Sequence, residues 1–269
     1  MRQLMLDGPG AVRWEEVPDV DLRGAGSTIV RPIAVATCDL DVAVLRGRFR
    51  LAGPYPFGHE AVAEVVEIGH DVVSVAAGDV VVVPFQISCG RCGPCRRGRT
   101  GNCASHPPLS TYGLGPMGGF AWGGFLADRV LVPHADAMLV SLPPGIDAAA
   151  AASVSDNIAD AWRTVEPQLR TDPGAEVLVV GGDAGPQSIG LYAVGLAVAV
   201  GAGRVVYADR DPPASASQPA SAPRSMTDRC PPSSARFPSR SMPAVTMMGL
   251  GARSTAPRST GRARARPCT

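Results

Sequence analysis

Short apolar stretches broken by glycine and proline fill the first half of the chain. Arg2–Leu6 and Ala11–Val17 flank a Gly-Pro-Gly turn, and Thr28–Ala36 alternates β-branched with small residues. Such runs between turn-forming residues are typical of β-strands. Asp39–Leu45 has its apolar residues on one helical face and predicts a short helix, so Cys38 would lie near a helix N-terminus, where a thiolate is favoured.

The pattern changes after a last strand expected at Phe125–Val132. Ala148–Ala152 is rich in alanine and Asn157–Val165 is amphipathic, so both segments predict helices. Pro167 and Pro173 lie at the two ends of the next segment and predict that residues 167–173 form a linker after the second helix.

Beyond residue 173 the chain predicts a strand, a helix and a second strand. Glu176–Val180 is a continuous apolar run of the kind found in parallel sheets, Ile189–Val200 is helical in pattern, and Arg204–Ala208 is again apolar. A glycine-rich turn follows the first strand, and Asp209 ends the second. This order is typical of a dinucleotide-binding βαβ unit, in which the pyrophosphate approaches a helix N-terminus and the acid binds the ribose hydroxyls.

The glycine motif of this unit is imperfect. Gly185 and Gly190 have the expected outer separation, but Gln187 stands in the middle and Gly182 precedes them by a few residues. We therefore expect a longer loop of different shape around Gly182, Gly185 and Gly190. Asp209 favours NAD over NADP, because a carboxylate repels a 2′-phosphate.

Composition and charge divide the chain into two different kinds of sequence. The 269 residues are 45% hydrophobic and 18% charged, which is enough apolar material for one or two domains. Residues 1–211 hold sixteen Arg against twenty-three acids, a net charge of −7, whereas residues 212–269 hold nine Arg against one acid, a net charge of +8. We expect a cytoplasmic protein, because no signal peptide or membrane span is recognisable.

Residues 212–269 are rich in Pro, Ser, Ala and Arg and show no hydrophobic period. Composition predicts a disordered tail. Every basic residue of the chain is Arg, which indicates a GC-rich gene, and our hypothesis is that the tail is an out-of-frame or truncated continuation of a longer protein. The alternative is a genuine basic arm that contacts phosphates.

Four cysteines, Cys89, Cys92, Cys95 and Cys103, fall within fifteen residues among several glycines. This spacing predicts a zinc site, because C-x-x-C turns deliver thiolates in pairs to one tetrahedral ion. Four protein ligands close the coordination shell, so this zinc would be structural. An iron–sulfur site and two disulfides are the alternatives.

Gly58-His59-Glu60 directly precedes an apolar run that predicts a strand. A solvated loop histidine is the common alternative to a metal ligand, but Cys38 upstream and the cysteine cluster downstream favour a metal site. The order Cys38, Gly58-His59-Glu60, Gly78-Asp79-Val80-Val81 and then four cysteines closely resembles the zinc-containing medium-chain alcohol dehydrogenases over about residues 1–211. The resemblance implies an α/β fold, with an irregular GroES-like β-barrel catalytic domain followed by a partial Rossmann βαβ unit.

By this resemblance, Cys38 and His59 are the first two ligands of a catalytic zinc, and Glu60 is the glutamate that can approach the metal. The third ligand would be Asp156, although Asp156 could instead cap the following helix, and Asp160 is its competitor. Zinc with an open fourth position would act as a Lewis acid on an alcohol that gives a hydride to NAD.

Three positions depart from the family pattern. Leu40 and Ala43 replace the hydroxyl and imidazole that usually relay the proton, and Ala63 stands where the family has glycine. The route of the proton is therefore not given by the resemblance.

The sequence thus predicts a catalytic domain at 1–150 with a zinc lobe at 89–103, a partial NAD-binding domain at 151–211 and a disordered tail at 212–269. The expected function is a zinc- and NAD-dependent alcohol dehydrogenase; the alternative is a catalytically inactive zinc-binding fragment. We expect one catalytic and one structural Zn²⁺, an alcohol substrate, and no membrane or nucleic-acid partner. A homo-oligomer is implied by the family, although the sheet edge that would form it is missing from this sequence.

Overall fold

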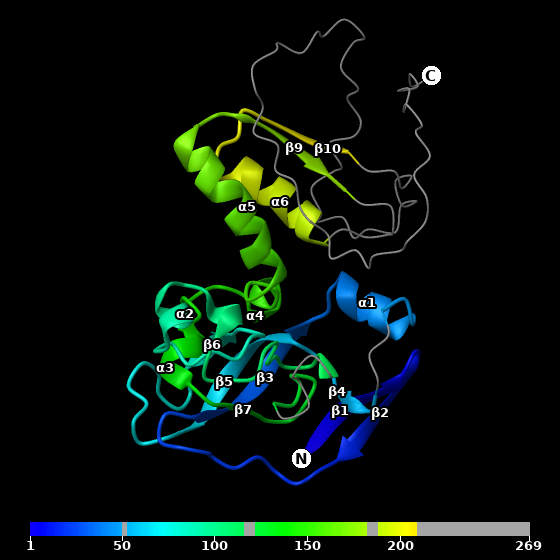
Figure 1. Ribbon diagram of the computed structural model, residues 1–269, viewed down its shortest axis with the longest axis vertical. Helices are drawn as coiled ribbons and strands as arrows, with labels where there is room; N and C mark the ends of the chain where they lie inside the picture. The colour runs from blue at the N-terminus through cyan, green and yellow to red at the C-terminus, as the bar shows by residue number, and fades with distance from the viewer. Residues whose placement is uncertain (50–52, 116–121, 182–187, 209–269) are drawn as a thin grey trace, which may run out of the picture.

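The protein is described by a computed structural model over residues 1–49, 53–115, 122–181 and 188–208 (Figure 1). The predicted glycine-loop residues Gly182 and Gly185, the predicted ribose ligand Asp209 and the tail at 212–269 lie outside these ranges. The elements follow one another as β1 (Arg2–Gly8), β2 (Ala11–Glu16), β3 (Thr28–Ala36), α1 (Asp39–Leu45), β4 (Tyr55–Pro56), β5 (Glu60–Ile68), β6 (Val80–Val83), α2 (Gly93–Arg96), a 3₁₀ turn (Thr100–Asn102), β7 (Val130–Val132), α3 (Ala135–Met138), β8 (Val140–Ser141), α4 (Ala148–Ala151), α5 (Asn157–Thr171), β9 (Glu176–Val180), α6 (Ser188–Ala199) and β10 (Arg204–Ala208).

A five-stranded antiparallel sheet, in the order β7-β3-β5-β6-β8, carries the largest core. One face buries β-branched residues of the central strands, among them Val30, Val65 and Val81, together with Phe125. On the other face, Val62 packs against α4, so β5 is buried on both sides at its start. This double burial removes solvent from the beginning of β5, next to His59.

The register of β3 and β5 decides which loop residues meet. The antiparallel pairing sets Ala36 opposite Glu60, so the residue after the end of β3 and the residue before β5 lie at the same end of the sheet. Cys38 and His59 are therefore neighbours in space although twenty-one residues separate them.

A smaller sheet, β2-β1-β4, completes the first unit. Leu6, Val44, Tyr55 and Phe57 form its core and attach α1 to it. Isolated β-bridges, such as that between Gln3 and Ala127, connect this sheet to the rest of the unit, which gives the irregular β architecture expected from the sequence.

The second unit consists of the parallel strands β9 and β10 with helices α5 and α6 packed together on one face (Figure 1). Helix α5 buries Ala161, Val165 and Leu169, which recur every four residues along one stripe. Helix α6 meets this stripe with the small residues Ala193 and Ala197, which lets the two helices approach closely. The strand–helix–strand order predicted for residues 176–208 is confirmed, and the mixed α/β fold class with it.

Two local predictions are wrong. Residues 167–173 do not form a linker, because α5 continues through Pro167 to Thr171. The burial of Leu169 continues the apolar stripe one turn beyond Val165, past the proline, and the Thr171 hydroxyl donates to the Pro167 carbonyl. These contacts offset the backbone hydrogen bond that proline cannot donate, because its nitrogen carries no hydrogen. The strand expected at 125–132 is reduced to β7, Val130–Val132.

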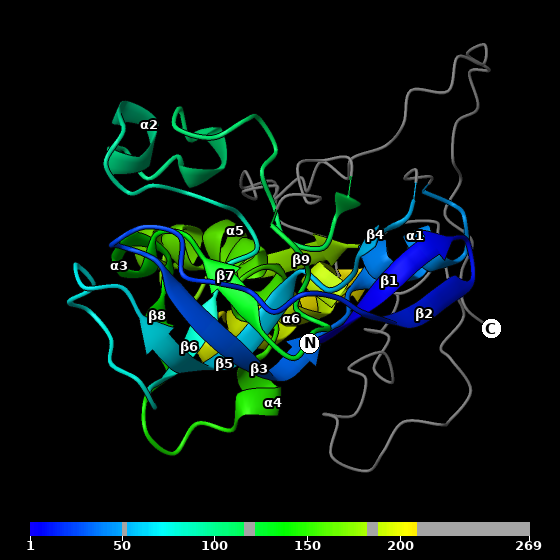
Figure 2. The ribbon, with the colours of Figure 1, turned by 90° about the horizontal axis from the view of Figure 1, so that it is seen from below.

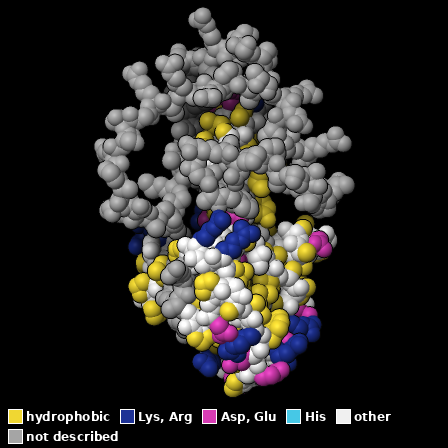
Figure 3. Space-filling model, turned by 90° about the vertical axis from the view of Figure 1, so that its right-hand side faces the viewer, with side chains coloured by type: hydrophobic (Ala, Val, Ile, Leu, Met, Phe, Trp, Pro, Cys, Tyr) yellow, Lys and Arg dark blue, Asp and Glu magenta, His cyan; other side chains and the backbone are white. Residues whose placement is uncertain are grey.

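The surface of the first unit carries charges of both signs. Arginines and acidic side chains are interspersed over the lower part of the face shown in Figure 3, and exposed ion pairs include Arg13 with Asp7 and Arg129 with Asp19. Among the described residues, no helix is long and apolar enough to cross a membrane.

Candidate metal centres

Three side chains from distant segments converge at the end of the large sheet. Cys38 is the N-cap residue of α1, His59 directly precedes β5, and Asp156 is the N-cap residue of α5. Cys38 Sγ lies 3.5 Å from His59 Nε2, and Asp156 Oδ2 lies 3.3 Å from the same nitrogen. The imidazole and thiol are almost fully buried, whereas the Asp156 side chain is 17% exposed.

These distances fit a tetrahedral zinc ion. Zinc bonds of about 2.3 Å to sulfur and about 2.0 to 2.1 Å to nitrogen and oxygen give tetrahedral edges of about 3.5 Å for S···N and about 3.3 Å for N···O. The observed separations of 3.5 Å and 3.3 Å match both edges. The ligand atoms of Cys38 and Asp156 lie within 4.8 Å of each other, so these two residues and His59 could hold one ion.

Asp156 occupies a helix cap position without capping the helix. Its side chain makes no cap hydrogen bond to α5 and lies against His59 instead. The competing residue, Asp160, pairs with Arg163 at 3.0 Å on the helix surface and is not among the four clustered side chains Cys38, His59, Glu60 and Asp156.

Asp41 lies directly beside the histidine, and the sequence analysis did not identify it. Its Oδ2 accepts a hydrogen bond from the Cys38 amide at 2.8 Å, and its Oδ1 lies 3.2 Å from His59 Nδ1. This second pair is not aligned as a hydrogen bond, but both side chains are buried and the short separation makes the contact strongly electrostatic. A proton on Nδ1 facing the carboxylate leaves Nε2 free to bind a metal. The acid three residues after the Cys38 cap was the available signal, since it completes a capping box.

The site is strongly electronegative. Burial lowers the pKa of His59, but the contacts with Asp156, Asp41 and Cys38 outweigh burial and raise the pKa to about 12. The cluster therefore favours a positive charge at the centre of the three ligand atoms. A bound cation would supply that charge in place of the proton.

Glu60 is fully buried beside this centre, and two residues hold it. Asn157 Nδ2 donates to Oε1 at 2.9 Å and Ser153 Oγ donates to Oε2 at 3.1 Å. Burial and the neighbouring Asp156 raise the pKa of Glu60 to about 7. Neither Ser153 nor Asn157 was singled out from the sequence, because nothing local relates them to a carboxylate more than ninety residues away.

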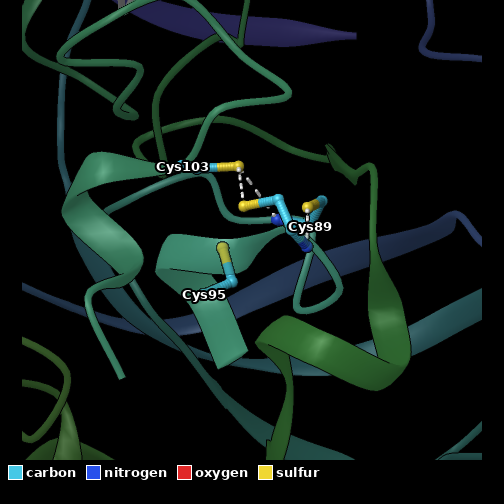
Figure 4. Close-up of side chains that lie close together, drawn as sticks. Cys89, Cys95 and Cys103 are labelled. Carbon is cyan, nitrogen blue, oxygen red and sulfur yellow. Dashed lines mark hydrogen bonds between the residues drawn. The ribbon is translucent and has the colours of Figure 1, made fainter. Parts of the chain in front are cut away.

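The second centre is the cysteine lobe, residues 89–103, which projects from the body of the first unit (Figure 2). The ligand atoms of its four cysteines lie within 4.8 Å of one another, and Cys92 Sγ and Cys103 Sγ are 4.0 Å apart. The S···S edge of a tetrahedral zinc site is about 3.8 Å. None of the five described cysteines forms a disulfide, and the sulfurs of the labelled lobe residues point toward one another (Figure 4).

Hydrogen bonding and burial change the pKa values of the lobe thiols in ways that bear on cation binding. The Ser105 hydroxyl donates to Cys89 Sγ at 3.2 Å and lowers the pKa of that thiol to about 5. Burial raises the pKa of Cys95 to about 12, and a cation would offset this penalty. Gly90 attaches the lobe to α3: it has a φ of +69° and lies so close that a Cβ would be 2.6 Å from Ala137 Cβ.

A pair of histidines connects the segment just after the lobe to the residue before α3. His106 Nε2 and His134 Nε2 are 2.7 Å apart, and the Trp122 ring meets His106 edge-on. Each of these two histidines is therefore the partner of the other.

The predicted nucleotide site is described only in part. Gly190 is buried in the first turn of α6. The helix begins at Ser188, whose amide and hydroxyl both donate to the Asp39 carboxylate, at 2.6 Å and 2.9 Å. A side chain from α1 thus occupies the N-terminus of α6, the position at which a βαβ unit binds phosphate.

Comparisons with known proteins agree with this architecture. Residues 24–144 match the alcohol dehydrogenase GroES-like domain. The chain is 34% identical over 212 residues to a Mycobacterium tuberculosis protein named probable zinc-binding alcohol dehydrogenase, covering 78% of this chain and 52% of that protein. It is also 34% identical over 223 residues to the glutathione-independent formaldehyde dehydrogenase of Pseudomonas aeruginosa, covering 78% and 54%.

A solved structure shows the same arrangement. The alcohol dehydrogenase TADH from Thermus sp. ATN1 superposes with a TM-score of 0.69 at 29% identity, covering 79% of this chain and 59% of that one. The chain spans about half the length of the relatives it matches. The match of residues 24–144 to the GroES-like domain, the βαβ order of the second unit and these similarities together make the chain similar to the zinc-containing medium-chain alcohol dehydrogenases over the residues that they cover.

Proposed function

We propose that this chain is a zinc- and NAD-dependent alcohol dehydrogenase that oxidises a small alcohol, with a catalytic zinc held by Cys38, His59 and Asp156. The observation that supports the proposal is that Cys38 Sγ and Asp156 Oδ2, from two other segments, lie 3.5 Å and 3.3 Å from the buried His59 Nε2. Residues 1–150 would form the catalytic domain, and residues 151–211 the nucleotide-binding unit.

The chemistry follows from the ligand set. Zinc bound there would supply Lewis acidity toward the alcohol oxygen, and NAD would accept the hydride. The Asp41 carboxylate would favour the His59 tautomer with the proton on Nδ1, and Cys38 and Asp156 would together balance the charge of the ion. Solvent reaches the site on the side of Asp156, the most exposed ligand, so we expect the alcohol to enter there.

We assign the lobe a second, structural zinc, because its four cysteines leave no ligand position open. The dinucleotide would bind at the β9–α6–β10 unit, with its pyrophosphate at the start of α6. Asp209, placed by the sequence at the end of β10, favours NAD over NADP. This assignment requires Asp39 to leave the N-terminus of α6 when the cofactor binds.

Metal analysis and turnover test the proposal together. The purified chain should contain two zinc ions, Cys38→Ser should contain one, and Cys95→Ser should lose the other. NADH formation is then measured for a panel of primary and secondary alcohols. A zinc content that does not change in Cys38→Ser would refute the catalytic site, and no NADH from fully zinc-loaded protein would refute the activity.

A further inference from the structure

Glu60 lies next to the proposed zinc ligands without being spaced as one of them. Its Oε1 is 4.0 Å from His59 Nε2, whereas two atoms bound to one tetrahedral zinc are about 3.3 Å apart when they are nitrogen and oxygen. At bond lengths of about 2.0 to 2.1 Å, a separation of 4.0 Å would need an angle far above the tetrahedral value. In this structure Glu60 is therefore held just outside the coordination shell.

We propose that Asn157 and Ser153 are positioning residues that hold the Glu60 carboxylate away from the catalytic metal and so keep its fourth coordination position open for substrate. This inference rests on the proposed function, since it assumes a metal at Cys38, His59 and Asp156.

The hydrogen bonds are directed at the oxygen that matters. Oε1 is the Glu60 oxygen near His59 Nε2, and it is the one that accepts from Asn157 at 2.9 Å. Ser153 holds the other oxygen at 3.1 Å, and Asn157 Nδ2 also lies 3.4 Å from the Ser153 hydroxyl. Each carboxylate oxygen thus has its own donor, and the two donors support each other.

Burial makes this arrangement effective. Glu60 is 0% exposed, Asn157 4% and Ser153 7%, so water competes poorly for the carboxylate. Hydrogen bonds to an ionised group are about twice as strong as neutral ones. If one donor is removed, a cation only a few ångströms away becomes the best remaining partner for the freed oxygen.

The proposed ligand Asp156 and the two donors, Ser153 and Asn157, lie within five residues of one another in the chain. Ser153 and Asn157 flank Asp156 in the turn that leads into α5, and the Ile158 amide donates to the Ser153 carbonyl at 3.1 Å. One rigid turn therefore supplies the third metal ligand and restrains the glutamate that could become a fourth.

A merely structural role makes a different prediction. If Asn157 only satisfied a buried carboxylate, its loss would lower stability and leave the coordination of the metal unchanged. The metal must therefore be observed directly. Co²⁺ is a suitable probe because its visible bands shift when the fourth ligand changes and weaken when a fifth donor is added.

The experiment compares Co²⁺-loaded wild type, Asn157→Ala and Asn157→Ala/Glu60→Gln, each as a difference spectrum against its Cys38→Ser counterpart to remove the lobe signal. We expect the Cys38-dependent bands to shift in Asn157→Ala. Imidazole, titrated as a ligand for the open position, should bind about 10- to 100-fold more weakly, the factor by which one hydrogen bond to a charged group shifts an equilibrium. Glu60→Gln in the same protein should restore both, because an amide is a poor metal ligand. Gln168→Ala, an exposed carboxamide on the same helix, is the matched control and should behave as wild type.

Ser153 provides a second, milder test should Asn157→Ala fail to fold. Ser153→Ala should show part of the spectral shift, and Ser153→Thr, which keeps the hydroxyl, should reverse it. Unchanged bands and unchanged imidazole affinity in Asn157→Ala, or in Ser153→Ala where that is the folded variant, would overturn this inference alone. A wild type with no Cys38-dependent cobalt band would overturn the proposed metal site and the inference with it.

Discussion

Asp41 provides the sharpest test of how the fold prepares its metal site. The substitution is Asp41→Asn, which keeps the size of the side chain and an oxygen that can accept from the Cys38 amide. Asp41 is the third residue after the Cys38 cap, and its side chain accepts from the Cys38 amide; asparagine keeps an oxygen for this bond, so the start of α1 should remain intact. What the change removes is the negative charge 3.2 Å from His59 Nδ1.

The expected magnitude follows from the role of that charge. A carboxylate behind a ligating histidine fixes its tautomer and raises its basicity, and loss of such a partner costs about 10- to 100-fold in metal affinity. This corresponds to about 1.4 to 2.8 kcal/mol. Because Asp41 is completely buried, solvent should screen little of this effect.

Competition with a chromophoric chelator measures the affinity of both zinc sites in one titration. The wild type should bind the Cys38-dependent zinc more tightly than Asp41→Asn does. The lobe has its own four ligands, so its zinc affinity should be the same in both proteins and serves as an internal reference. Asp147→Asn is the matched control, since Asp147 caps α4 through the Ala150 amide at 2.8 Å and contacts neither site. Equal zinc affinity in wild type and Asp41→Asn, or an equal loss at both sites, would refute the reasoning.

Three further predictions concern the lobe and the nucleotide unit. Cys95→Ser should remove one zinc per chain and leave the Cys38-dependent zinc in place, as metal analysis would show. Burial, and next the charge of His106, lower the pKa of His134 from 6.5, so the unfolded chain binds a proton at His134 more readily than the folded chain does. The contribution of His134 to folding stability is therefore complete above a pH of about 6.5 and is lost as the pH falls below that value. His134→Asn should flatten this part of the curve of Tm against pH, and an unchanged slope would contradict it. Asp39→Asn should tighten NADH binding about 2- to 5-fold by fluorescence titration, because a carboxylate at a helix N-terminus is worth about 0.3 to 1 kcal/mol.

The cysteine lobe could be predicted from the sequence because its ligands lie close together along the chain. A C-x-x-C spacing has few ways to place two sulfurs other than side by side, and the structure brings all four together. The short helix at Asp39–Leu45 was equally local, and its predicted bounds are the observed ones. Pro167 shows the limit of such signals: a helix breaker by local rules lies inside α5, since the packing of Leu169 outweighs it.

The cluster of Cys38, His59, Glu60 and Asp156 was predictable only through the family resemblance. Cys38 and His59 meet because Ala36 pairs with Glu60, and no feature of either strand sets that register by itself. A shift of one residue would turn the side chains of β5 to the opposite face. Ser153 and Asn157 were beyond even the resemblance, because they matter through a carboxylate on another element.

Residues from both units meet in this cluster, so the proposed metal site lies at the boundary between the two units. β5 contributes Glu60, the loop before it contributes His59, and the turn into α5 contributes Ser153, Asp156 and Asn157. The second unit is therefore attached to the first through Asp156, which we propose binds the metal, and through Ser153 and Asn157, which hold Glu60. A change in the angle of α5 would lengthen the Asn157 bond to Glu60 and the distance from Asp156 to His59 at the same time. Since both contacts are short and buried, the position of the nucleotide-binding unit and the coordination of the metal are expected to change together rather than independently.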